Sequence, residues 1–180
     1  MMPVGLRVDA LSVDDGSLPP ASEFIGWVQQ LAAEHFRRKR EVPQMFLVFA
    51  TRPQARVLIV QPQGSGPSAR ETAWIAPAVR HLAAEVGARA IFMAGEAWRS
   101  SNDAFSARQG SEPRLDPQRK EGVLVNAENP NTTPVLQSFW AEIIRSKGRP
   151  HLGPWQTARF VEGRLGYLLP PEAYGRVGSA

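Results

Sequence analysis

The sequence contains no cysteine among its 180 residues. This lack excludes disulfides, thiolate nucleophiles and cysteine-ligated zinc, and it is typical of proteins kept in a reducing compartment. The first residues, Met1 to Arg7, do not form the basic stretch followed by an apolar core that a signal peptide needs. We therefore predict a cytoplasmic protein.

Long hydrophobic runs and histidine clusters are also lacking. The longest apolar runs have the length of a strand, far short of the roughly 20 residues of a membrane-spanning helix. The three histidines lie far apart, at positions 35, 81 and 151, with no second histidine at ligand spacing. Gly64-Ser65-Gly66 is not followed by the Gly-Lys-Ser/Thr of a P-loop, so it is interpreted as a plain loop. We expect no membrane contact, no metal and no cofactor, and we assign no catalytic residue.

The composition is that of an ordinary globular protein. A chain with 43% hydrophobic and 21% charged residues can bury one substantial core. We predict a single domain over residues 22–170, after an irregular N-terminal arm over 1–21 and before a loose C-terminal tail over 171–180. The net charge of +4 permits contact with nucleic acid, but small domains often carry this much charge for solubility.

Two segments carry apolar residues at helical spacing. Residues 23–40 repeat apolar side chains at steps of three and four, with Ser22 in the position of an N-cap. A second helix is predicted to begin at a capping box, Ser68-Ala69-Arg70-Glu71, and to end at Gly87. Pro77 lies inside this second helix and predicts a kink, or a restart with proline at its first position.

Four segments rich in β-branched and aromatic residues predict strands: 45–51, 56–61, 89–94 and 122–127. The first two form a predicted hairpin, and their nearly continuous apolar runs are typical of strands covered on both faces. Residues 135–145 fit both helical and strand spacing, and we favour a strand. The predicted fold class is α+β, with a mostly antiparallel sheet of about five strands, two helices packed on it and the order α-β-β-α-β-β-β.

The best candidate for a functional surface lies where the strand over 89–94 ends. Glu96, Trp98 and Arg99 follow it, and a polar stretch over 99–120 without periodicity comes next. Loops of this length inside compact domains are usually functional or disordered. A carboxylate and an indole at such a place predict a ligand-binding or partner-binding site. The alternative is structural: Trp98 covers the edge of the core, and Glu96 pairs with an arginine of the loop.

The same region resembles a family of uncharacterised bacterial and phage proteins, in which a Glu-Ala-Trp strand end precedes a Pro-x-x-x-Pro-x-Arg-x-Glu stretch. The matching residues are Glu96, Ala97, Trp98, Pro113, Pro117, Arg119 and Glu121. The chain departs from the family pattern at Gly95, Arg114, Leu115, Asp116 and Gln118, so any catalytic role of the family's His or Asp would be lost here. The resemblance covers roughly residues 22 to 150. It supports the order of elements and implies no activity.

Three hypotheses of function stay open. The leading one is a non-enzymatic binding or assembly protein that self-associates or binds a protein partner; a phage-derived origin follows from the resemblance alone. The residues assigned to this surface are Glu96, Trp98, Arg99, Arg119 and Glu121, with Arg119 predicted to bridge back to Glu96 and so to clasp the loop. The alternative of a small enzyme would use Glu96 with Arg119 and Glu121.

The second alternative is a nucleic-acid accessory protein. It would use Arg37, Arg38, Lys39 and Arg40, together with positive residues between 145 and 164, namely Arg145, Lys147, Arg149, Arg159 and Arg164. A basic cluster at a helix C-terminus more often remains solvated, where the helix dipole stabilises it by about 0.3–1 kcal/mol per cation.

Overall fold

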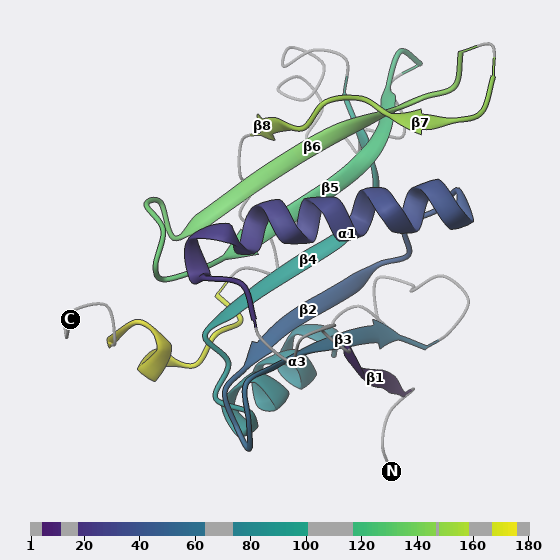
Figure 1. The fold of residues 1–180 in the computed structure, drawn as a ribbon. Helices are drawn as coiled ribbons and strands as arrows, with labels where there is room; N and C mark the ends of the chain where they lie inside the picture. Colours follow the sequence, from purple (N-terminus) through teal and green to yellow (C-terminus); the bar gives the residue numbers. More distant parts are fainter. Residues whose placement is uncertain are drawn as a thin grey trace.

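An antiparallel sheet of eight strands, with one helix packed on each face, forms the architecture of the computed structural model (Figure 1). The structure describes residues 5–11, 18–63, 74–100, 117–146, 148–158 and 167–175. The predicted α+β class is confirmed. The strands are β1 (Leu6–Leu11), β2 (Met45–Ala50), β3 (Arg56–Pro62), β4 (Ala90–Arg99), β5 (Lys120–Glu128), β6 (Leu136–Ile144), β7 (His151–Leu152) and β8 (Gln156–Ala158). The helices are α1 (Phe24–Lys39) and α3 (Ile75–Glu85), with short 3-10 turns η1 (Ala21–Glu23) and η3 (Pro171–Ala173).

The strand order is β1-β3-β2-β4-β5-β6-β7, with β8 also paired to β6. The predicted hairpin is confirmed, since β2 and β3 pair antiparallel from Phe46 opposite Val60 to Ala50 opposite Arg56. The strand favoured over residues 135–145 is also confirmed as β6, which pairs with β5. A long antiparallel meander therefore runs from β4 to β6.

Strand β1 corrects the prediction that residues 1–21 form an irregular arm. Residues 6–11 pair antiparallel with β3, from Leu6 opposite Pro62 to Leu11 opposite Val57. Side chains alternate between the two faces of a strand, and Leu6 and Leu11 each pack against one of the two cores. The segment becomes a strand because β3, about fifty residues later in the chain, offers it an unpaired edge.

Each face of the sheet has its own hydrophobic core. Under α1, Phe24 packs against Phe49 at a ring-centroid distance of 3.9 Å, and Phe49 lies 5.4 Å from Phe92. Under α3, Phe46 and Ile91 pack with the apolar side of that helix. Because both faces are covered, every residue of β2 is buried, as its continuous apolar run predicts.

The helix ends differ in detail from the predictions. Ser22 does not cap α1, because it lies in η1 and the N-cap position belongs to Glu23, which makes no side-chain capping bond. The helix ends at Arg40, whose left-handed backbone (φ 63°) lets its N–H donate to Phe36 O at 2.7 Å. Pro77 is the third residue of α3 as described, where no intrahelical donor is lost. The predicted capping box, residues 68–71, lies outside the described residues.

The C-terminal segment contradicts the prediction of a loose tail from residue 171. Leu168 and Leu169 are buried in the core under α3, and Ala173 and Tyr174 pack against it. The described part of the tail, up to residue 175, is therefore anchored on the sheet. None of the helices within the described ranges is long and apolar enough to cross a membrane.

Candidate functional site

Three of the predicted candidate residues, Glu96, Trp98 and Arg99, lie along the far half of β4 rather than after it. The apolar run ends near Ala94, but β4 continues to Arg99 and pairs with β5 along its whole length. Phe92 and Ala94 belong to the core under α1, so Glu96 and Trp98, two and four residues further on, lie on that same face of the sheet. Arg99 has the opposite parity, faces the other side and lies opposite Lys120.

Strands β5 and β6 bring further side chains to this place. Val123 belongs to the core under α1, so the alternation puts Glu121 on the same face, and Trp98 is its cross-strand partner. Ile143 likewise belongs to that core, and Arg145 follows it by two residues. We define the charged rim as this group of residues at the end of the sheet: Glu96, Trp98, Arg119, Glu121 and Arg145.

A two-pronged ion pair joins β5 to the end of β6. Arg145 donates from Nε to Glu121 Oε2 at 2.8 Å and from Nη2 to Glu121 Oε1 at 2.9 Å. The hydrogen bond from Arg145 lowers the pKa of Glu121 below its ordinary value of 4.5 although partial burial opposes the shift, and the positive charge of Arg119 acts in the same direction. Glu121 is therefore a fixed carboxylate at neutral pH. The planar, two-bond geometry holds both side chains in place.

Trp98 is the exposed aromatic residue of the rim. Its side chain remains 47% exposed although it lies in a paired strand. The guanidinium carbon of Arg119 lies 4.7 Å from the centre of the indole ring, a cation–π contact. At an exposed site such a contact contributes about 0.5–1 kcal/mol, enough to orient the ring without burying it.

Glu96 makes a contact that the sequence analysis did not predict. Glu96 Oε1 accepts a hydrogen bond from the N–H of Val42 at 2.9 Å, and the Glu96 N–H donates to Val42 O at 3.1 Å. These two bonds tie the connection between α1 and β2 to β4. The sequence does not reveal this pairing, because nearly every residue type carries a main-chain N–H, so the identity of Val42 does not mark it as a donor. Arg119 lies against the ring of Trp98, and its predicted bridge to Glu96 stays a prediction.

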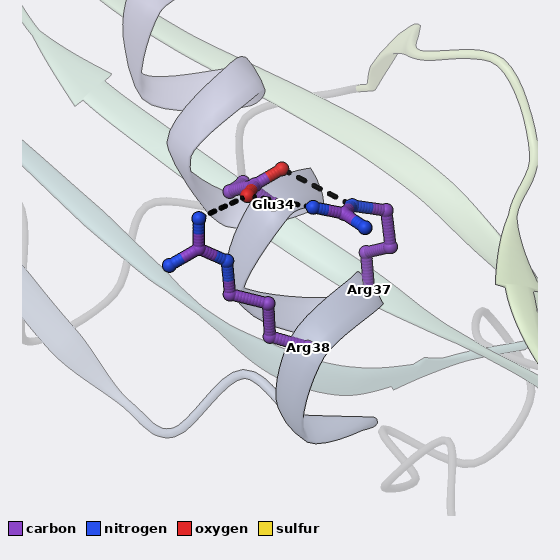
Figure 2. A network of polar contacts seen from close by, with 3 residues as sticks. All are labelled: Glu34, Arg37 and Arg38. Atoms are coloured by element: carbon purple, nitrogen blue, oxygen red, sulfur yellow. Dashed lines mark hydrogen bonds and ion pairs between the residues drawn. The ribbon is translucent and has the colours of Figure 1, made fainter.

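The basic cluster of α1 is largely engaged within the protein. Figure 2 shows Glu34 between the guanidinium groups of Arg37 and Arg38. Glu34 Oε1 lies 2.8 Å from Arg37 Nη2 and 2.7 Å from Arg38 Nη2. The hydrogen bond from Arg37 lowers the pKa of Glu34. Arg40 donates to Pro150 O at 3.1 Å and so links the end of α1 to the segment before β7. Of the other positive residues proposed to bind nucleic acid, Arg145 pairs with Glu121, whereas Lys147, Arg159 and Arg164 lie outside what the structure describes.

A buried carboxylate that the sequence analysis missed holds the C-terminal segment. Glu128, at the end of β5, is only 4% exposed. It accepts hydrogen bonds from Leu168 N at 2.6 Å and Leu169 N at 3.1 Å, and from the Tyr174 hydroxyl. A buried carboxylate needs such donors, since an unpaired one is strongly destabilising. We call this group, Glu128 with Leu168, Leu169 and Tyr174, the Glu128 latch.

A cavity of about 440 Å³ lies at the other end of β4 from the rim. Its walls come from the end of β2, the end of α3 and η3, through Thr51, Arg52, Ala84, Gly87, Ala88, Pro170, Glu172 and Ala173. Arg52 donates to Ala84 O at 2.7 Å, and Thr51 Oγ1 donates to Gly87 O at 2.8 Å, so two polar side chains of this wall already bind the protein's own main chain. The cavity was not predicted, because its walls come from segments far apart in the sequence.

Within the described residues, no three His, Cys, Asp or Glu side chains gather closely enough to hold a metal ion. Comparisons with protein-family models, with curated proteins and with solved structures give no match.

Proposed function

We propose that this chain is a binding or assembly protein and that the charged rim is the surface on which a protein partner docks. The observation that carries the proposal is the exposure of Trp98, 47%, in a strand whose backbone is paired and whose ring is oriented by Arg119. Tryptophan and arginine are the residues most enriched among those that dominate binding energy in protein interfaces. A rigid ring of this kind loses little conformational entropy when a partner covers it.

The mixture of charges around Trp98 favours a protein over a nucleic acid as the partner. Glu121 pairs with Arg145 on the rim, beside the guanidinium of Arg119 that contacts Trp98. A phosphate backbone is bound by cations without interleaved carboxylates, because affinity comes from counterion release by positive charge. In the basic cluster of α1, Glu34 already pairs with two arginines. The nucleic-acid and small-enzyme alternatives therefore rank below a protein partner.

The test compares three forms of the chain as bait: wild type, Trp98→Ala and Tyr167→Ala. Tyr167 is a matched control, since it is also an exposed aromatic residue, 58% exposed, but lies away from the rim. After cross-linking in cells that produce the chain naturally, mass spectrometry should find a protein that wild type and Tyr167→Ala capture and that Trp98→Ala loses. With that partner purified, Trp98→Ala should raise the dissociation constant of the complex by about 30-fold or more, as expected for a dominant interface residue.

Two outcomes would overturn the proposal. One is that every protein captured by wild type is captured equally by Trp98→Ala, while circular dichroism shows that the variant is folded. The other is that a labelled single-stranded oligonucleotide binds at low salt and loses affinity in Trp98→Ala, because base stacking on an exposed ring would then be its role. For the enzyme alternative, Glu96→Gln should abolish any phenotype that depends on the chain, and an unchanged phenotype would dismiss that alternative.

A further inference from the structure

Strand β1 lies at the end of the strand order of the described sheet. Among the described strands it pairs with β3 alone, so its outer edge is unpaired within the described residues. In Figure 1 it lies at the side of the sheet opposite to β6 and β7, and in the strand order β3 and β2 separate it from β4. The outer edge of such a strand presents main-chain N–H and C=O groups that are ready to pair with another strand.

The register shows which main-chain groups of β1 point outward. Gln63 N donates to Gly5 O at 2.9 Å, which makes Gly5 and Gln63 a hydrogen-bonded pair of the β1–β3 ladder. Such pairs alternate along antiparallel strands, so Arg7 and Asp9 also direct their main-chain groups toward β3. Leu6, Val8 and Ala10 then direct theirs toward the open edge. The Leu6 position agrees with this, because it lies opposite Pro62, which has no N–H to donate.

The side chains of β1 make this edge complementary to itself. Val8, the middle residue of the outward-directed set, is 44% exposed. Arg7 and Asp9 flank it on the other face of the strand and pair with each other, Nε to Oδ2 at 2.6 Å, with side chains 61% and 47% exposed. Arg7 thus carries a positive charge on one side of Val8, and Asp9 carries a negative charge on the other. If a second copy is turned by 180° about Val8, its Asp9 faces Arg7 of the first copy, and its Arg7 faces Asp9.

We propose that β1 pairs antiparallel with β1 of a second copy of this chain, about a two-fold axis through Val8, so that the two sheets become continuous. Val8 then lies opposite Val8, and Leu6 opposite Ala10 of the second copy, with about six main-chain hydrogen bonds across the axis. Arg7 falls opposite Asp9 of the second copy. This is a non-hydrogen-bonded pair, the kind in which facing side chains approach most closely.

The charges also select this register over its neighbours. The nearest alternative registers that still pair the outward-directed main-chain groups move the two-fold axis from Val8 to Arg7 or to Asp9. They put Arg7 opposite Arg7 or Asp9 opposite Asp9 of the second copy, and like charges directly opposite one another are destabilising. Only the register centred on Val8 joins unlike charges at both positions. The interface leaves the rim uncovered, so it is separate from the partner surface proposed above.

The test uses sedimentation equilibrium over a range of concentrations, with the full chain. Wild type should show a monomer–dimer equilibrium. Val8→Pro removes an outward N–H that the β1–β3 ladder does not use, so the monomer should stay folded by circular dichroism while the dimer dissociation constant rises by about tenfold or more. Trp98→Ala is the control and should dimerise as wild type does.

Charge exchange tests whether the charged side chains of the two β1 strands face one another. Arg7→Asp and Asp9→Arg should each be monomeric at concentrations where wild type is dimeric, because each variant faces like charges. Mixed in equal amounts, the two variants should form a heterodimer, since each then meets the opposite charge of the other. The proposal is overturned if wild type remains monomeric up to its highest soluble concentration, if Val8→Pro dimerises like wild type, if the mixed variants fail to associate, or if Trp98→Ala abolishes the dimer.

Discussion

Replacing Glu128 by alanine should cost this protein much of its stability. The substitution leaves three donors without an acceptor: the main-chain N–H groups of Leu168 and Leu169 and the hydroxyl of Tyr174. Each of the two buried main-chain donors, left unsatisfied, costs about 1–3 kcal/mol, and the lost bond of the half-buried Tyr174 hydroxyl adds about 0.5–1.5 kcal/mol. Glu128→Ala should therefore lower the free energy of unfolding by about 2.5–7.5 kcal/mol, which for a chain of this length corresponds to a fall in Tm of roughly 5–30 °C.

Two milder variants grade the effect. Tyr174→Phe removes one donor and leaves the carboxylate bonded to Leu168 and Leu169, so a loss of about 1–2 kcal/mol is expected. Glu128→Gln keeps one acceptor oxygen but turns an amide NH₂ toward a donor. Its loss in free energy of unfolding should therefore lie between those of Tyr174→Phe and Glu128→Ala. Urea denaturation measures the free energies, and amide hydrogen exchange at Leu168 and Leu169 reports whether the segment detaches locally.

The latch also predicts a dependence on high pH. Burial, and then the hydrogen bond to Glu128, raise the pKa of Tyr174 above its ordinary value of 10. A raised pKa means that the fold favours the protonated phenol, so this stabilisation is fully present below about pH 10 and is lost as the pH rises further. Tyr174→Phe should lack this part of the alkaline loss. The reasoning would be refuted if Glu128→Ala unfolded within about 1 kcal/mol of wild type with unchanged exchange at Leu168 and Leu169.

Three further outcomes follow from the packing and the ion pairs. Gly122→Ala should lower the free energy of unfolding by about 1–3 kcal/mol. A Cβ at this position would lie 2.6 Å from Ala141 O and overlap the Trp140 ring. Unaltered thermal unfolding of the variant would contradict this prediction. Gly26→Ala should stabilise by roughly 0.5–1 kcal/mol, because this position in α1 has nothing within 4 Å of a Cβ; a lowered Tm would count against it. Arg145→Ala should raise the pKa of Glu121 toward 4.5. A lowered carboxyl pKa stabilises the fold fully above the unfolded pKa, and this contribution is lost as the pH falls through the lower, folded pKa. The small stability loss of Arg145→Ala should therefore be present at neutral pH and disappear in acid, and an NMR titration that shows no shift of Glu121 would contradict it.

The sequence predicts those parts of the fold that side-chain pattern determines. The helix over residues 23–40, the hairpin and the antiparallel class follow from hydrophobic spacing and β-branched content. The strand preference for residues 135–145 also holds, because alternate residues such as Ser138 and Trp140 are buried on the face opposite α1. Where one face of an element is consistently buried, its sequence carries that information.

Features that depend on main-chain pairing across long separations could not be predicted. No side chain of β1 is fully buried, and its partner β3 lies about fifty residues away. The end of β4 was placed too early because its last residues are polar, although their main chain still pairs with β5. The same holds for the candidate site: its residues were found by type, but the partner of Glu96 is a main-chain N–H and the partner of Glu121 is Arg145, neither of which residue spacing indicates.

The Glu128 latch has a consequence for the order in which this protein can fold during synthesis. The three donors to Glu128 come 40, 41 and 46 residues after it in the chain. Until those residues leave the ribosome, the carboxylate has only water as a partner, so burying the end of β5 is unfavourable. The sheet can form its β4–β5–β6 meander earlier, but the core under α3 closes only when the last segment arrives. Folding of this core is therefore completed only after residues 168–174 have been synthesised.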